Sequence, residues 1–420
     1  MDANEPLSAY RTVPRTGVIY VMGEAGKRGF HYGNPEWCNL GQGAPETGPL
    51  PGSVPRISQI AVDVSTYEYA PVGGIWELRE AVATLYNARY RRGMPSQYSA
   101  ENVAIAAGGR LGLTRLAAAL DEVHLGHLLP DYTAYAELLG TFERFVPIPL
   151  VLSRRDGFHL TPDRLRHAIV GVGLGAVLLS NPCNPTGRVI RGGELRAYVD
   201  ICRELSCQLI FDEFYAHYLY DDVAVAEGPA NSAARYVEDV ETDPVVLIDG
   251  LTKNWRYPGW RLSWTVGPKA LIERVTSGGS YLDGGAPHPM QRAALPLVTQ
   301  EVADLEARAI QSTFKAKRDV LVKRAQAMGM TFQNEPQGAF YGFACLDNLP
   351  EPLRDGMDFF RAALERKVIC VPGEFFDVDP GQRRQHIPSR LKNYVRLSFG
   401  PAMSEVVAGL DRLDAMISAC

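Results

Sequence analysis

The chain has 420 residues, of which 46% are hydrophobic and 22% are charged, so it is long enough to form two domains. A net charge of −5 gives no reason to expect a nucleic-acid partner. The longest apolar stretch, "AIVGVGLGAVLL", is too short to span a bilayer, and the polar N-terminus shows no signal peptide. The seven scattered cysteines lack metal-ligand spacing, so we expect reduced thiols, no metal and a cytoplasmic protein.

The middle of the chain alternates short apolar runs with helical patterns. A helix is expected to begin at about Leu111, a second has Thr161 as N-cap before Pro162, and "GELRAYVDICREL" has apolar residues at helical spacing. Apolar strands that alternate with helices indicate a mostly parallel sheet covered on both faces, the three-layer architecture of an α/β domain. The expected strands are 102–107, 176–180, 207–212, 244–249 and 261–266.

The pattern changes near residue 303. A long helical pattern at 303–328 is followed by short strands mixed with helices, which is typical of an α+β domain. We therefore expect residues 56–302 to form a large α/β domain and residues 303–420 a smaller α+β domain. Residues 1–55 are expected to be an N-terminal segment that packs with the small domain.

Several unusual residues stand directly after the expected strands. They are Gly109, Asn184, Asp212 and Lys253. In sheets of this kind, ligands bind beyond the carboxyl ends of the strands. These residues therefore mark the expected ligand site.

Lys253 lies in "DGLTKNWRYPGWRLSW", among aromatic residues and eight residues before Arg261. Burial lowers the pKa of a lysine, and a neutral amine can form a Schiff base with a carbonyl group. An arginine is suited to a phosphate, so the pair indicates an aldehyde ligand that also carries phosphate. The alternative is a surface lysine whose stem packs on apolar neighbours.

Three other motifs have a functional and a structural interpretation. Asp212 ends an apolar strand, and its carboxylate could pair with the N–H of a pyridinium ring that Tyr215 could also reach. The alternative is that Asp212 caps a helix and that Tyr215 is a packed core residue. Asn184, in "SNPCNPTG", could donate to a ring oxygen or only form a rigid turn. The Gly108–Gly109 turn before a helix could bind phosphate, although such turns are common.

In this order, the motifs resemble the pyridoxal-phosphate-dependent aminotransferases of fold type I, class I/II. The resemblance covers most of the chain. It implies an aspartate-aminotransferase-like fold, with a large domain that binds pyridoxal 5'-phosphate (PLP), and a homodimer with shared sites. Further matching segments are 40–48, 69–82, 184–187, 212–215, 337–341, 372–376 and 395–400.

The resemblance also implies a role for individual residues at the reacting end of the cofactor. Lys253 would form the internal aldimine and later move the proton released from Cα. Asp212 would keep the pyridine nitrogen protonated, so that the ring accepts electrons. Tyr215 and Asn184 would donate to the ring O3′.

Other residues would bind the phosphate, the ring face and the substrate. Gly109, Arg110 and Arg261 would bind the phosphate, although Arg110 could contribute only its backbone. Tyr132 would stack on the ring unless it is an ordinary core aromatic. Tyr69 would reach the phosphate of the neighbouring subunit. Gly43 and Arg396 would contact the substrate α-carboxylate, unless Arg396 pairs with a structural carboxylate.

The chain departs from the family pattern in two places. Relatives usually have a serine or threonine three residues before the lysine, where this chain has Gly250, and Thr252 is expected to compensate. The run 278–298 replaces a Ser/Thr-rich segment and contains His288, whose role is open, and Asp283. Asp283 is a candidate to contact a cationic substrate group, with a helix or turn cap as the alternative.

The leading functional prediction is an aminotransferase that moves the amine of an L-α-amino acid to a 2-oxo acid. The alternative is a PLP enzyme of specialised metabolism, as in natural-product biosynthesis. Such an enzyme eliminates or replaces a β or γ group, forms a C–C bond or oxidises its substrate. Both predictions stand because the residues of the substrate pocket, and not the cofactor, decide which of these reactions follows. A non-catalytic effector-binding domain is a third interpretation, which the intact lysine, aspartate and arginine argue against.

Overall fold

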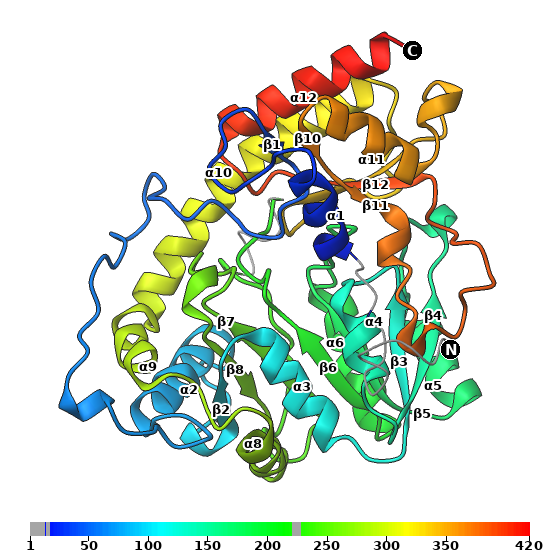
Figure 1. The fold of residues 1–420 in the computed structure, drawn as a ribbon. Helices are drawn as coiled ribbons and strands as arrows, with labels where there is room; N and C mark the ends of the chain where they lie inside the picture. Colours follow the sequence, from blue (N-terminus) through cyan, green and yellow to red (C-terminus); the bar gives the residue numbers. More distant parts are fainter. Residues whose placement is uncertain (1–12, 14–16, 221–227) are drawn as a thin grey trace, which may run out of the picture.

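The computed structural model describes residue 13, residues 17–220 and residues 228–420. Figure 1 shows a large sheet with helices packed around it and a second group of elements above it, which includes the C-terminal helix. The first twelve residues, for which no signal peptide is expected, lie outside the described residues. Within the described part of the chain, no helix combines the length and the apolar character that crossing a membrane requires.

The large sheet has seven strands in the order β2-β8-β7-β6-β5-β3-β4. β8 is antiparallel to both neighbours, whereas the other strand pairs are parallel, so the mostly parallel α/β sheet is confirmed. The strands are β2 Val103–Ala106, β3 His124–Leu129, β4 Val146–Val151, β5 Leu174–Ser180, β6 Gln208–Asp212, β7 Val245–Gly250 and β8 Ser263–Val266.

Two of these strands, β3 and β4, were not expected from the sequence. β4 contains Pro147 and Pro149, which cannot donate to a ladder and argue against a central strand. β4 is the last strand of the order and pairs with β3 alone. The nitrogens of its prolines, which carry no hydrogen, can therefore point to the side that has no neighbouring strand. The two prolines are therefore compatible with a strand at the edge of the sheet.

The helices that follow these strands begin close to where the sequence places them. Thr161 caps α5, and its Oγ1 accepts from the N–H of Arg164 at 3.3 Å. α3 and α8 pack together, as do α5 and α6. The helices of this region are α2 Trp76–Tyr90, α3 Gly109–Ala119, α4 Ala134–Gly140, α5 Pro162–Val172, α6 Gly192–Glu204, α8 Lys269–Leu282 and α9 His288–Ala294.

The C-terminal part contains a three-stranded antiparallel sheet in the order β11-β12-β9. The N-terminal segment packs here, because β1 pairs with β10 and α1 contacts β11. The division at residues 55 and 302 stays a prediction, and α10 begins just before the second boundary. The elements are α1 Gly17–Gly26, β1 Cys38–Asn39, α10 Gln300–Ala327, β9 Tyr341–Cys345, α11 Gly356–Glu365, β10 Val368–Ile369, β11 Val371–Pro372, β12 Tyr394–Ser398 and α12 Met403–Ser418.

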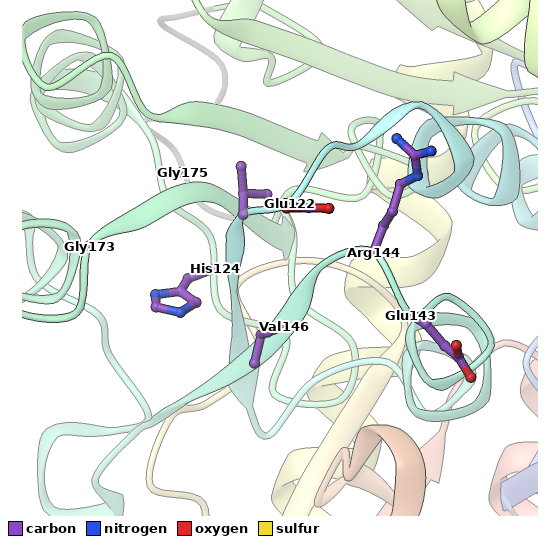
Figure 2. Close-up of a pocket in the computed structure, with 8 residues that line it drawn as sticks. Glu122, His124, Glu143, Arg144, Val146, Gly173 and Gly175 are labelled. Carbon is purple, nitrogen blue, oxygen red and sulfur yellow. The ribbon is translucent and has the colours of Figure 1, made fainter.

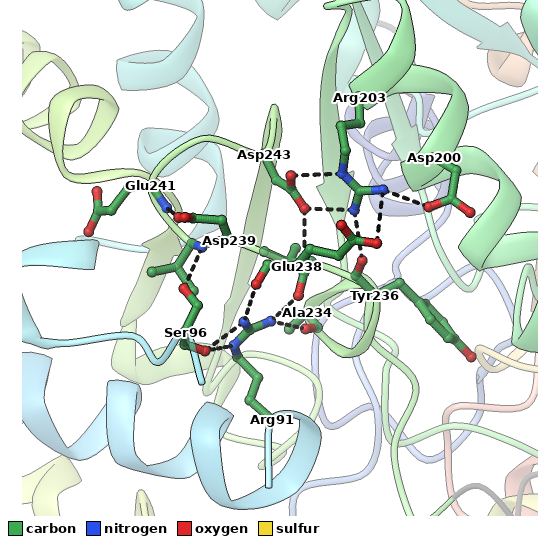
Figure 3. Close-up of polar contacts among 12 residues, drawn as sticks. Arg91, Ser96, Asp200, Arg203, Ala234, Tyr236, Glu238, Asp239, Glu241 and Asp243 are labelled. Carbon is green, nitrogen blue, oxygen red and sulfur yellow. Dashed lines mark hydrogen bonds and ion pairs between the residues drawn. The ribbon is translucent and has the colours of Figure 1, made fainter. Parts of the chain in front are cut away.

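A buried arginine at the end of α2 holds the loop that leads into β7 (Figure 3). Arg91 donates to the carbonyls of Ala234 at 2.9 Å and Val237 at 2.6 Å, and also to that of Ser96. Its side chain is fully buried. Since buried carbonyls without a donor are costly, Arg91 fixes the entry to the strand that leads toward Lys253.

We expect Arg91→Ala to lower the apparent free energy of unfolding by about 3 kcal/mol, because it leaves several buried carbonyls unpaired. Urea denaturation followed by circular dichroism measures the effect. Arg166→Ala, which removes an exposed ion pair with Glu204, is the control and should change little. An equal loss in both variants would contradict the structural role of Arg91.

Candidate functional site

The residues predicted from the strand ends lie together at one edge of the large sheet. Asp212 ends β6, and Lys253 follows the end of β7 at Gly250. The Lys253 side chain reaches the N-terminal segment, where its ammonium nitrogen donates to the carbonyl of Gly43. The site thus combines strand ends of the large sheet with the N-terminal segment around Gly43, which lies 210 residues before Lys253 in the chain.

Asp212 is a buried carboxylate with polar donors, and no cationic side chain among the described residues is in hydrogen-bond contact with it. Its Oδ2 accepts from the hydroxyl of Tyr135 at 2.9 Å, and its Oδ1 accepts weakly from the N–H of Phe214 at 3.4 Å. Burial raises the pKa of Asp212 to about 6, and the Tyr135 hydrogen bond opposes the shift. A cationic N–H placed beside it would stabilise the ionised form.

Lys253 is held in a state that favours the neutral amine. Burial, together with the positive charges of Arg396, Arg261 and Arg110, lowers the pKa of Lys253 to about 7, while the charge of Asp212 opposes the shift. A lysine with a pKa near neutrality is suited to nucleophilic attack on a carbonyl group.

The end of β2, the start of α3 and the Lys253 loop form a group of anion-binding donors. Gly108 has a φ of 93°, and a Cβ there would lie 2.3 Å from Nη2 of Arg261, so glycine is required for the arginine to approach. Gly109 and Arg110 open α3, where backbone N–H groups are free to bind an anion. The buried hydroxyl of Thr252 has no hydrogen-bond partner in the part of the chain that the structure describes.

Arg396 and Asn184 form a second polar group on the side of β12. Arg396 donates to Oδ1 of Asn184 at 3.0 Å and to the carbonyl of Gly41 at 2.9 Å. The guanidinium lies 4.1 Å from the ring centre of Tyr341, and its Nε is buried without a partner. Arg396 has no carboxylate partner in the described structure, so its charge is available to an anionic ligand.

Aromatic residues line the space between these groups. The hydroxyls of Tyr215 and Tyr341 lie 3.0 Å apart. Arg110 donates to the hydroxyl of Tyr132 at 3.2 Å. The contribution of Tyr135 was missed because its sequence context, "TAYAELLG", has the pattern of an ordinary helix. Tyr341 stands in the matching segment 337–341, but the sequence did not indicate a place for it in the site.

The orphaned polar atoms test whether the site fits a ligand with both a phosphate and a carboxylate. The Thr252 hydroxyl belongs to the residue before Lys253, and the Arg396 Nε lies on β12, in the C-terminal sheet. Buried polar atoms without partners are rare in native proteins and are costly. Two anionic groups at these positions would satisfy them, so the residues present fit such a ligand.

Tyr69 stands apart from the other predicted residues in the single chain. Its side chain is 95% exposed, and Val64 and Tyr67 nearby are also largely exposed. Figure 1 shows the segment between β1 and α2 running along the outside of the molecule. An exposed apolar segment of this kind is typical of an interface with another chain.

The structure does not support a substrate contact for Asp283. Nε of Arg115 donates to its carboxylate at 2.9 Å, and the two side chains are 1% and 7% exposed. The N–H of Gly285 also donates to Asp283 at 2.9 Å, which fits the turn-capping alternative. A carboxylate already paired inside the protein gains little from a second cation. His288 lies 3.2 Å from the carbonyl of Glu68 and has no assigned role.

A separate hollow of about 780 Å³ lies at the opposite end of the sheet (Figure 2). Its lining includes His124 and Val146, which begin β3 and β4. In parallel sheets the catalytic groups gather at the carboxyl ends of the strands, and this hollow lies at the amino ends. It is therefore distinct from the Lys253 site.

The chain matches the family model described as aminotransferase class I and II over residues 35–411. An aspartate aminotransferase of Streptomyces avermitilis is 27% identical over 100% of this chain and 99% of its own length. A probable N-succinyldiaminopimelate aminotransferase of Mycobacterium tuberculosis is 30% identical over 83% of this chain and 84% of its own length.

A solved aspartate aminotransferase of Thermus thermophilus with maleate superposes with a TM-score of 0.76 at 24% identity, covering 97% of this chain and 100% of that one. This likeness confirms the expected fold. Because the family model spans nearly the whole chain, including the loop of Lys253 and the strand of Arg396, this protein belongs to the class I and II aminotransferase family.

Proposed function

We propose that the protein is a PLP-dependent aminotransferase that moves the amine of an L-α-amino acid to a 2-oxo acid. The observation that carries the proposal is the joint presence of Lys253 with a lowered pKa and of Asp212 without a cationic partner in hydrogen-bond contact, at one edge of the sheet. The first suits an aldehyde and the second suits a pyridinium nitrogen. When bound, the cofactor would supply an electron sink that stabilises negative charge at the substrate Cα.

Each group of residues has a defined task in this proposal. Arg261, Thr252 and the first turn of α3 would hold the phosphate. Asp212 would accept the ring N–H, and Asn184 and Tyr215 would donate to the ring oxygen. Their positions at the strand ends and at the start of α3 support this assignment.

The substrate would be oriented by Arg396 and its proton moved by Lys253. A guanidinium binds an α-carboxylate through two parallel hydrogen bonds, and the orphaned Nε of Arg396 is available for one of them. The Lys253 amine, when free, would be able to take a proton from the substrate Cα at physiological pH, because its pKa lies near 7.

A homodimer with shared active sites is part of the proposal. The exposed apolar side chains from Ile60 to Tyr69 supply a surface for a second copy. Tyr69, at the end of this segment, would then reach the phosphate in the partner's site.

We expect the purified protein to bind PLP with a visible absorbance band that borohydride reduction removes, because Lys253 forms a reducible bond to the aldehyde. Lys253→Ala should lose the covalent bond and at least about 10³-fold in activity. Lys269→Ala, at an exposed lysine paired with Glu101, is the control and should keep both properties. Wild-type protein that neither colours nor retains added PLP would refute the cofactor assignment.

A single-turnover reaction separates transamination from the alternative reactions. With one amino acid and no acceptor, we expect mass spectrometry to show about one 2-oxo acid per site, because the enzyme retains the amine. Further product should require an added 2-oxo acid. Continuous turnover without an acceptor, with release of ammonia or loss of a β or γ substituent, would instead favour an elimination or replacement enzyme.

The rate at which apoprotein captures PLP should depend on pH through Lys253. The pKa of about 7 means that the reactive neutral amine prevails above pH 7, so the rate should fall about tenfold per unit below it. Arg396→Met removes a positive charge that lowers this pKa, so the midpoint should move to higher pH. Exposed Arg390→Met is the control, and equal midpoints in all three proteins would contradict the electrostatic assignment. Stopped-flow absorbance measures the rates.

A further inference from the structure

We propose that Ser263 supplies a hydroxyl donor to the cofactor phosphate, in the space that Gly250 leaves free. This inference rests on the proposed function, because it concerns the phosphate of the same cofactor. It accounts for the departure at Gly250 through a residue of the neighbouring strand, in addition to the compensation expected from Thr252.

Gly250 and Ser263 are direct partners across the antiparallel pair of β7 and β8. Side chains of directly opposed residues point to the same face of a sheet. A Cβ on Gly250 would lie 2.6 Å from Cα and 2.9 Å from Cβ of Ser263, and 2.5 Å from the carbonyl oxygen of Leu262. Such distances are too short, and the two shortest involve backbone atoms, so position 250 cannot carry a side chain beside this strand.

The same distances place the Ser263 side chain almost where one from position 250 would begin. Ser263 is also the direct partner of Ala106, the last residue of β2. Gly108 and Gly109 follow that strand and begin α3. A Cβ on Gly112, in the first turns of this helix, would lie 3.6 Å from Oγ of Ser263. The hydroxyl therefore faces the N-terminal part of α3, on the side of the sheet where the phosphate donors gather.

The Ser263 hydroxyl is buried and only weakly bound. It donates to the carbonyl of Ala106 at 3.3 Å, and that oxygen already accepts from the N–H of Gly108 at 2.8 Å. A serine hydroxyl rotates freely to a better acceptor, and a phosphate oxygen is a stronger one than a shared carbonyl. Arg261, two residues earlier, contacts Gly108, so the arginine and the hydroxyl approach the same glycine turn.

Thr265 provides a matched control for the loss of a buried hydroxyl. It lies on the same strand and the same face, two residues further on, and its Oγ1 is buried without a partner. It pairs with Ile248 in β7 and Ala104 in β2, so it lies deeper in the sheet than the strand ends.

The first experiment compares PLP with pyridoxal, which has the same ring and aldehyde but no phosphate. Dissociation constants are measured by fluorescence titration of apoprotein for wild type, Ser263→Ala and Thr265→Val. We expect Ser263→Ala to weaken PLP binding about tenfold and to leave pyridoxal binding unchanged, since only the phosphate loses a donor. Thr265→Val should change neither constant. Ser263→Ala with a PLP constant within about twofold of wild type, or with an equal loss for pyridoxal, would overturn the proposal.

The second experiment tests whether position 250 can carry the donor itself. Gly250→Ser should weaken PLP binding or destabilise the protein, because its Cβ would meet the backbone of Leu262 and Ser263. Removing the Ser263 side chain leaves those backbone atoms in place, so Gly250→Ser/Ser263→Gly should bind PLP no more tightly than Ser263→Gly. A double variant that is folded by circular dichroism and binds PLP as tightly as wild type would show that the donor need not come from Ser263, and would overturn the proposal.

The two proposals fail in different ways. Wild-type protein without any PLP binding would refute the proposed function. Normal PLP binding that Ser263→Ala leaves intact would refute the role of Ser263 alone. The ³¹P resonance of bound PLP gives an independent reading, because losing a donor to the phosphate should shift it in Ser263→Ala and not in Thr265→Val.

Discussion

The cost of removing charge from water governs the design of this site. Burial is the largest cause of the raised pKa of Asp212 and of the lowered pKa of Lys253, so it disfavours the charged form of both groups. A phosphate-bearing aldehyde with a basic ring nitrogen would relieve both, because it pairs the carboxylate and consumes the amine. The free-energy cost of burying these two groups in the empty site would therefore favour the binding of such a ligand.

The surrounding scaffold keeps this unfavourable arrangement in place. Tyr135 donates to Asp212, and the neighbouring Glu213 accepts from the hydroxyl of Ser232 at 2.6 Å and the N–H of Ala233 at 2.8 Å. Arg91 fixes the loop before β7 through its carbonyls. Polar groups at the strand ends are thus held by dedicated donors, which keeps the site geometry fixed before a ligand arrives.

The pairing of Gly250 with Ser263 brings a hydroxyl from the neighbouring strand beside a position that cannot carry a side chain. The antiparallel β8 brings a residue thirteen positions later in the chain into the space beside β7. A close cross-strand contact permits one side chain and excludes the other, so a glycine in a binding loop can signal a donor supplied by its neighbour. Asp283 also departs from the family pattern, but its carboxylate accepts from Arg115 inside the protein, so this departure has a structural explanation.

The sequence by itself determined five strands of the seven-stranded sheet, several helices and the residues at the strand ends, because apolar periodicity and the motifs around Asn184, Asp212 and Lys253 are local signals. It missed β4, since Pro147 and Pro149 are acceptable only at a sheet edge, and the edge is defined by strand order. Only the tertiary structure decided the partners of Asp212, Asp283 and Gly250, because hydrogen bonds and steric exclusion between residues distant in sequence depend on how the strands and helices are placed side by side.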